Sequence, residues 1–271
     1  MKRALIVVGA LVALLVAGGV LFAVTGGPLL DLAPDELDTS EAARAKGRTV
    51  LEESFAAVGG EAAWFRPKSQ SFTLRDEWPG VYALFSPWPS GDITATVVQN
   101  RHTFDSTTTF TAGADEGLVW SLEGGRGYEG TGAERTAVDN ADLNFILPTT
   151  HYFVEAPQRL LEAELVTYVG RETVGGTAYD VVYLTWSDWA ATPEFDQYLA
   201  YVNVENRRLE KLYYTVREIM PSVSGTMHYR DFRPVSGVLV PHDMTVTALP
   251  GDDPDGKYLH RMTVTDFAFG D

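Results

Sequence analysis

A strand, a tight turn and a second strand are predicted by the sequence Tyr229-Arg230-Asp231-Phe232-Arg233-Pro234-Val235-Ser236-Gly237-Val238-Leu239-Val240-Pro241. The first part ends one strand, the chain turns at Gly237, and the valine-rich part begins the next strand. The same kind of sequence continues on both sides of this stretch, from Ser69 to the C-terminus. Short runs rich in Thr, Val, Tyr, Phe and Trp alternate there with Gly, Pro, Asn and Asp. We predict strands over residues 70–76, 81–86, 92–99, 102–111, 117–122, 165–171, 177–187, 197–204, 208–216, 223–232, 238–248 and 257–268. Such a series is typical of an antiparallel meander, either a sandwich or a barrel.

Two segments with helical spacing interrupt this pattern. The first opens at Asp38-Thr39-Ser40-Glu41, whose small polar side chains can cap free N–H groups, and it stops at Gly59-Gly60. The second segment, residues 139–163, falls in the middle of the strand order. Helices inserted between strands usually cover one open face of a sheet. We therefore predict a mainly β (α+β) fold, a curved antiparallel sheet with helices on its concave side, and we call residues 139–163 the lid segment.

Three stretches carry a resemblance to a known family. They are the helix end Ala57-Val58-Gly59-Gly60-Glu61-Ala62-Ala63-Trp64, the stretch 170–182 followed by Tyr198-Leu199-Ala200-Tyr201-Val202-Asn203, and the stretch 229–241 quoted above. In this order they resemble the LolA/LolB-like outer-membrane lipoprotein-sorting superfamily of periplasmic lipoprotein carriers, as a divergent member, over residues 45–269. The resemblance implies an unclosed β-barrel with a helical lid over an apolar cavity that holds acyl chains or other lipid. No single binding residue transfers from the family to a position here.

The N-terminus predicts export. Two cations, Lys2 and Arg3, precede a run from Ala4 to Val24 without one charged side chain. A span of hydrocarbon takes about 20 apolar residues, so residues 1–27 are predicted to be a transmembrane anchor, with a cleaved signal peptide as the alternative. The cations favour the cytoplasmic side, which places the rest outside. We expect an acidic spacer over 28–38 and one domain over 39–271, in the cell envelope at the cytoplasmic membrane or secreted after cleavage.

Composition and motifs exclude several function classes. The chain has no cysteine, which excludes disulfides, a thiol nucleophile and a lipid on cysteine. The formal net charge of −16 disfavours nucleic acid and an anionic bilayer surface as partners. The five histidines lack paired metal-ligand spacing, and we find neither a Gly-x-Ser-x-Gly elbow nor a phosphate-binding loop. We therefore expect no cofactor, no metal and no catalysis.

Aromatic residues near the lid segment give the positive indication of function. Apolar ligand sites are built from such side chains with few polar groups, although a plain aromatic core has the same composition. The sequence thus favours binding of lipid, lipoprotein acyl chains or another apolar ligand. The alternatives are an envelope scaffold or protein-interaction domain with a filled core and, third, a hydrolase. The candidate ligand-binding residues are Trp120, Tyr152, Phe153, Leu160, Trp186, Trp189 and Tyr213, with Trp189 expected at the cavity mouth.

Overall fold

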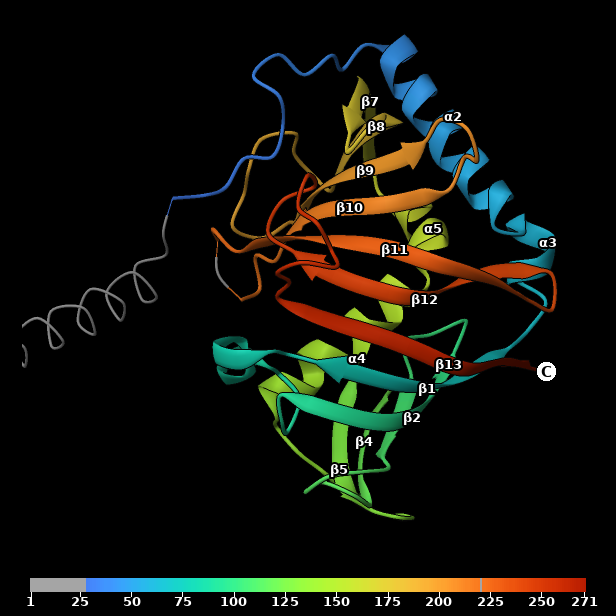
Figure 1. Ribbon diagram of the computed structural model, residues 1–271, viewed down its shortest axis with the longest axis vertical. Coiled ribbons are helices and arrows are strands. Elements are labelled where there is room, and N and C mark those ends of the chain that lie inside the picture. Colours follow the sequence, from blue (N-terminus) through green and yellow to red (C-terminus); the bar gives the residue numbers. More distant parts are fainter. Residues whose placement is uncertain (1–27, 220) are drawn as a thin grey trace, which may run out of the picture.

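The computed structural model describes residues 28–219 and 221–271, and the predicted anchor over 1–27 lies outside these residues. The strands of the described part form one antiparallel sheet of 13 strands in the order β6-β5-β4-β3-β2-β1-β13-β12-β11-β10-β9-β8-β7 (Figure 1). The sheet is open, because β6 and β7 at its two edges each pair with one neighbour. The strands are β1 Ser69–Glu77, β2 Asp92–Asn100, β3 Ser106–Phe110, β4 Leu118–Glu123, β5 Arg126–Thr131, β6 Glu134–Ala137, β7 Leu165–Val174, β8 Thr177–Thr185, β9 Gln197–Asn203, β10 Leu209–Thr215, β11 Ser224–Val235, β12 Val238–Thr247 and β13 His260–Gly270.

The predicted turn between β11 and β12 is confirmed. Val235 pairs with Val238, which leaves Ser236 and Gly237 as a two-residue turn. Both residues have positive φ, 48° and 90°. This is the hairpin conformation whose twist matches that of the flanking strands, and glycine adopts it without steric cost.

The sheet is completed by a pairing of distant parts of the sequence. β1 pairs with β2 on one side and with β13 on the other, and Ser69 lies opposite Gly270. Strands β2–β6 therefore extend from one side of the β1–β13 pair, and strands β7–β12 extend from the other.

Two features of the strand prediction were wrong. Residues predicted as a strand over 81–86 form a 3-10 helix, η1 (Gly80–Phe85), because Pro79-Gly80 turns the chain and leaves no neighbouring strand for it. The sequence also did not predict β5 and β6, which form one edge of the sheet. Both are short and rich in polar residues, as edge strands often are, and β5 also contains two glycines.

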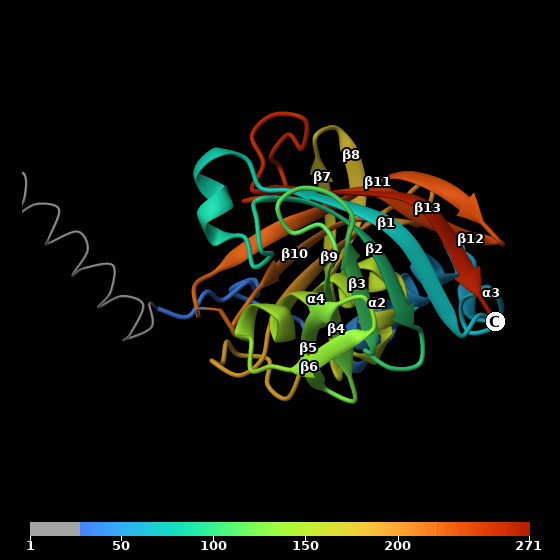
Figure 2. The ribbon, with the colours of Figure 1, turned by 90° about the horizontal axis from the view of Figure 1, so that it is seen from below.

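The helical segments form where they were predicted. Ser40 caps α2 (Glu41–Ala57), its hydroxyl accepting from the Ala43 amide at 3.3 Å, and α3 (Gly60–Trp64) follows. The lid segment contains α4 (Ala141–Val154), α5 (Ala156–Arg159) and η2 (Leu160–Glu162). Figure 2 shows the sheet arching over α2 and α4, on its concave side. Among the described helices, none is long and apolar enough to cross a bilayer.

The lid segment connects the two edges of the sheet. It leaves β6 through residues 138–140 and enters β7 through residues 163–164. Its apolar side chains, including Leu143, Leu147 and Leu160, are buried in the main core together with inward-facing residues of both halves of the sheet. Side chains of the protein itself therefore fill much of the concave side.

Candidate functional site

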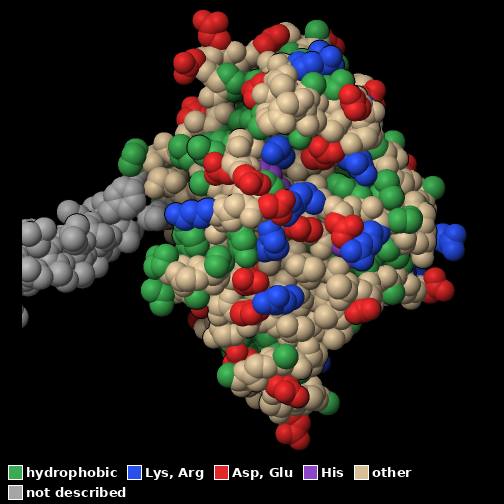
Figure 3. All heavy atoms as spheres, in the orientation of Figure 1, with side chains coloured by type: hydrophobic (Ala, Val, Ile, Leu, Met, Phe, Trp, Pro, Cys, Tyr) green, Lys and Arg blue, Asp and Glu red, His purple; other side chains and the backbone are tan. Residues whose placement is uncertain are grey.

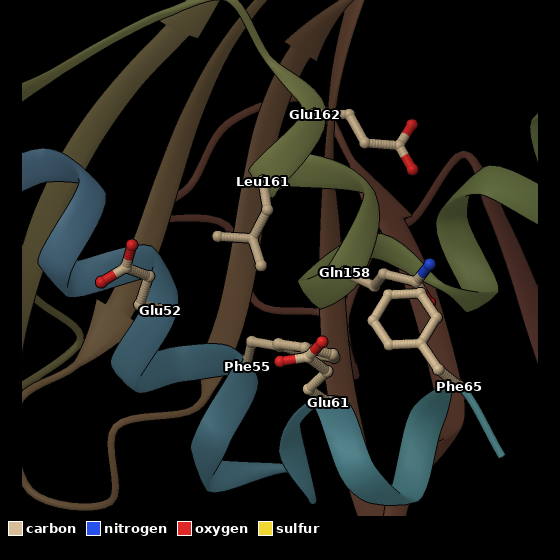
Figure 4. A pocket seen from close by; sticks show the side chains of 7 residues that line it. All are labelled: Glu52, Phe55, Glu61, Phe65, Gln158, Leu161 and Glu162. Carbon is tan, nitrogen blue, oxygen red and sulfur yellow. The ribbon is translucent and has the colours of Figure 1, made fainter.

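A surface pocket of about 440 Å³ lies between the α2–α3 corner and the lid segment (Figure 4). We call it the helix pocket. Three helical segments form it, and residues three and four apart in each lie on one side of a helix. Its lining residues are Glu52 and Phe55 from α2, Glu61 and Phe65 from α3 and its C-cap, and Gln158, Leu161 and Glu162 from the lid segment.

The helix pocket combines an apolar wall with carboxylates. Its apolar wall consists of Phe55, Phe65 and Leu161. Glu162 pairs with Arg159 at 3.0 Å. Within residues 28–219 and 221–271, neither Glu52 nor Glu61 has an ion-pair partner. The arrangement suits an apolar group better than it suits an anion.

A buried ionic cluster lies behind this pocket and consists of Arg101, His151, Glu155 and Arg159. The last three follow each other at intervals of four residues, with His151 on α4, Glu155 at the junction of α4 and α5 and Arg159 on α5, so they share one helical face. Glu155 accepts from Arg159 Nη2 at 2.7 Å, and its carboxylate is 3.4 Å from His151 Nε2 and 3.5 Å from Arg101 Nε. Arg101 directly follows β2, so this carboxylate holds the lid segment to the sheet.

Arg101, like His151, is a member of the ionic cluster that makes no side-chain hydrogen bond among the described residues. Burial lowers the pKa of its guanidinium to about 10. Within the described part of the chain, none of its guanidinium nitrogens has a hydrogen-bond partner. The group lies over two aromatic rings instead, 4.4 Å from the Trp64 ring centroid and 4.7 Å from that of Phe269. Trp64 also contacts Phe55, with ring centroids 6.1 Å apart, and so connects the ionic cluster to the helix pocket.

Five of the seven predicted ligand-binding residues meet in the concave core. Trp120 on β4 donates to Glu129 at 2.8 Å, and Phe153 on α4 lies 4.7 Å from the Tyr214 ring. Burial raises the pKa of Tyr152. Leu160 is buried in the same core, against which Tyr152 and Trp186 also pack. None of the five lines the helix pocket.

The other two predicted residues, Trp189 and Tyr213, lie on the convex side. Successive side chains of a strand point to opposite faces. Trp189 stacks on Tyr183, whose neighbours Val182 and Leu184 enter the concave core, so Trp189 is not at the mouth of the helix pocket. Tyr213 packs in a separate convex cluster whose buried members are Tyr179, Val181 and Tyr201.

Sequence reasoning missed the lining of the helix pocket and the ionic cluster. The four-residue spacing of His151, Glu155 and Arg159 was the available signal, since it puts three ionisable groups on one helical face. Nothing in the sequence linked that face to Arg101, which is about fifty residues earlier. Among the described residues, no group of three His, Asp or Glu side chains could hold a metal ion.

The architecture defines a class, the open antiparallel half-barrel with helices on its concave side. The predicted resemblance to LolA/LolB-like lipoprotein-sorting proteins is confirmed at the level of this fold. An outer membrane lipoprotein-sorting domain from Vibrio parahaemolyticus has 11% identity and a TM-score of 0.52, over 83% of this chain and 93% of that one. A DUF1329 family protein from Desulfovibrio piger has 9% identity and a TM-score of 0.50, over 84% and 93%. A LolA superfamily protein from Nitrosomonas europaea has 16% identity and a TM-score of 0.49, over 83% and 94%.

These similarities concern the fold, since all three identities are below 25%. No protein-family model matches the sequence, and no curated protein matches it.

Proposed function

We propose that the domain binds lipid, an acyl chain or another apolar ligand in the helix pocket, without catalysis. The observation that carries this proposal is the apolar wall formed by Phe55, Phe65 and Leu161. Ligand pockets typically measure about 300–1,000 Å³ and are mostly apolar, and the volume of about 440 Å³ lies in this range. The lipoprotein-sorting name of the similar Vibrio domain supports the same class of ligand.

A long chain needs more room than the helix pocket offers. The concave core next to it is filled by side chains of the lid segment, including Leu147, Phe153 and Leu160. The lid segment must therefore move for a ligand to reach the predicted residues Trp120, Tyr152 and Trp186. Each buried methylene contributes about 0.8 kcal/mol. A chain of about ten methylenes thus contributes on the order of 8 kcal/mol, against the free energy needed to move the lid segment.

The test uses protein that begins at Pro28, purified without detergent. Native mass spectrometry then shows whether lipid co-purifies, and calorimetry measures the affinity for lysophosphatidylcholine below its micelle concentration. We expect Leu161→Glu to weaken binding at least tenfold, about 1.4 kcal/mol, because it puts a charge into the apolar wall.

The matched control is Leu165→Glu. Leu165 is half-buried, like Leu161, but it lines a separate cavity of about 280 Å³ beside α2. This variant should keep the wild-type affinity. Absence of binding to the wild-type protein, or an equal loss in both variants, would refute the helix pocket as the ligand site.

A scaffold or protein-interaction role is the second candidate. The filled concave core favours it, because such a core leaves little space for a ligand. A protein that carries no lipid after purification and binds none on titration would support this role instead.

The location outside the cytoplasm also belongs to the proposal. It rests on the charge-free run from Ala4 to Val24 after Lys2 and Arg3. N-terminal sequencing of the mature protein tests it. A start at Met1 supports an uncleaved anchor in the cytoplasmic membrane, whereas a start between Ala23 and Leu30 identifies a removed signal peptide.

A further inference from the structure

The strand connections are divided between the two ends of the sheet. In an antiparallel meander, successive connections alternate between these ends. Glu77 at the end of β1 lies opposite Arg261 at the start of β13, so the β1–β2 and β12–β13 connections share one end. We call it the entry end. By the same alternation its described connections are residues 78–91, 111–117, 132–133, 186–196, 216–219 with 221–223, and 248–259.

The described chain starts at the entry end. The Leu30 amide donates to Pro221 O at 3.4 Å, and Arg217 donates to Leu30 O. The Leu32 amide donates to the side chain of Gln197 at 3.1 Å. The first part of the predicted spacer is therefore bound to the domain. Figures 1 and 2 both show the start of the described chain and the β1–β2 connection on the left side of the molecule.

Exposed apolar side chains gather at the same end. Six of the nine large apolar side chains that are exposed in the described residues lie there. In η1, Val81 is 63% exposed, Leu84 82% and Phe85 70%. Each such side chain would gain about 1.5–3 kcal/mol from full burial. The remaining three of the six at the entry end are Leu29, Ile219 and Leu249.

The loop that carries η1 is held in place by the sheet. The Trp78 amide donates to Gly91 O at 2.6 Å, and the Trp78 ring stacks on His260 with centroids 4.2 Å apart. A Cβ on Gly91 would lie 2.5 Å from that of Ala83, so only glycine allows the loop to pack on itself. Trp88 is buried and donates to Asp76 at 2.8 Å. The fold thus presents the apolar side chains of η1 on an ordered support.

We propose that the entry end contacts a zwitterionic lipid bilayer and that η1 inserts into its interface. The choice of partner rests on the proposed anchor. Five residues lie between Val24 and the bound Leu30, and the resulting six steps of about 3.5 Å each span at most roughly 20 Å. A span that ends at Val24 therefore keeps the entry end close to the bilayer. Exposed acidic side chains at this end, Glu116, Glu194 and Glu218 among them, disfavour an anionic surface.

Single-cysteine labelling tests the contact directly, because the natural chain has no cysteine. A nitroxide on Leu84→Cys reports on η1 in the full chain, reconstituted with phosphatidylcholine vesicles. The matched control is Glu205→Cys, an exposed position in the β9–β10 turn at the opposite end. Power-saturation EPR compares access of oxygen, which concentrates in lipid, with access of a water-soluble nickel chelate. We expect an oxygen-rich, nickel-poor environment at residue 84 and the reverse at residue 205.

Equal access of nickel to both labels on vesicle-bound protein would overturn the proposal. So would exclusion of both reagents from residue 84, which would identify a protein partner or a second copy at this surface. Chain that fails to sediment with vesicles would refute the anchor. In that case excess vesicles test the contact of η1 with lipid by itself. An unchanged EPR signal at residue 84 would overturn the contact, and an oxygen-rich environment would support it. A nitroxide on Leu249→Cys should also lie in an oxygen-rich environment. Adding Val81→Ser with Phe85→Ser should expose that nitroxide to the water-soluble nickel chelate.

Discussion

Removing the charge of Glu155 is the most direct test of how the lid segment is held. Glu155 is fully buried, and it is the one carboxylate within 3.5 Å of both Arg101 and Arg159 in the described residues. Glu155→Gln keeps the shape of the side chain but leaves the buried Arg101 guanidinium without a counter-charge and Arg159 with only the half-exposed Glu162. Breaking a buried pair in this way costs about 3–5 kcal/mol, a large part of a typical stability of about 5–15 kcal/mol.

Urea unfolding of the protein from residue 28 onward, followed by tryptophan fluorescence, measures this loss. Glu162→Gln is the matched control, since Glu162 pairs with the same Arg159 from a half-exposed position. It should cost at most about 1 kcal/mol. Adding Arg101→Met to Glu155→Gln should restore part of the stability, because it removes the uncompensated charge. A loss below about 1 kcal/mol for Glu155→Gln, or additive losses in the double variant, would refute the reasoning.

Three further predictions concern other parts of the fold. Burial lowers the pKa of His228 to about 4 from 6.5. The unfolded state therefore binds the proton more readily than the folded state. The free energy of unfolding should fall by on the order of 3 kcal/mol as the pH is lowered from 6.5 to 4. Denaturation of His228→Gln should not show this fall with pH. Trp186→Ala should lower the free energy of unfolding by about 3 kcal/mol in a melting experiment. Trp189→Ala should lower it by about 1 kcal/mol and leave the lipid affinity unchanged. A loss of lipid affinity in Trp189→Ala would contradict the position of Trp189 on the convex side. The amides of α4 should exchange hydrogen faster than those of β8, because a gate opens from the less stable part of a fold; equal protection would assign α4 to the fixed core.

The sequence predicted the strands best where apolar alternation and turn residues agreed. β11 and β12 satisfy both criteria, and so does the capped start of α2 at Ser40. η1 was taken for a strand because Val81, Tyr82 and Phe85 have strand-like composition, although they lack a neighbouring strand. β5 and β6 escaped detection because an edge strand needs no buried face, and their polar side chains leave no period-two signal.

The candidate site was harder to predict, because its residues are brought together by tertiary contacts. Composition near the lid segment led to Trp120, Tyr152 and Phe153, which form core, while the helix pocket lies at the outer side of the same segment. Trp189 follows Trp186 by only three residues, but the chain turns between them and places the two rings on opposite faces. Local sequence carries no signal for that reversal.

The attachment of the lid segment at both ends has a mechanical consequence. A flap hinged at one end can swing without disturbing the wall beneath it. The lid segment instead joins β6 to β7 through linkers 138–140 and 163–164, so it resembles the chord of an arc, with the sheet as the arc. Raising the chord away from the wall changes the distance between its two ends, and the curvature of the sheet changes with it. The distance between β6 and β7 should therefore depend on the size of the ligand that the domain binds.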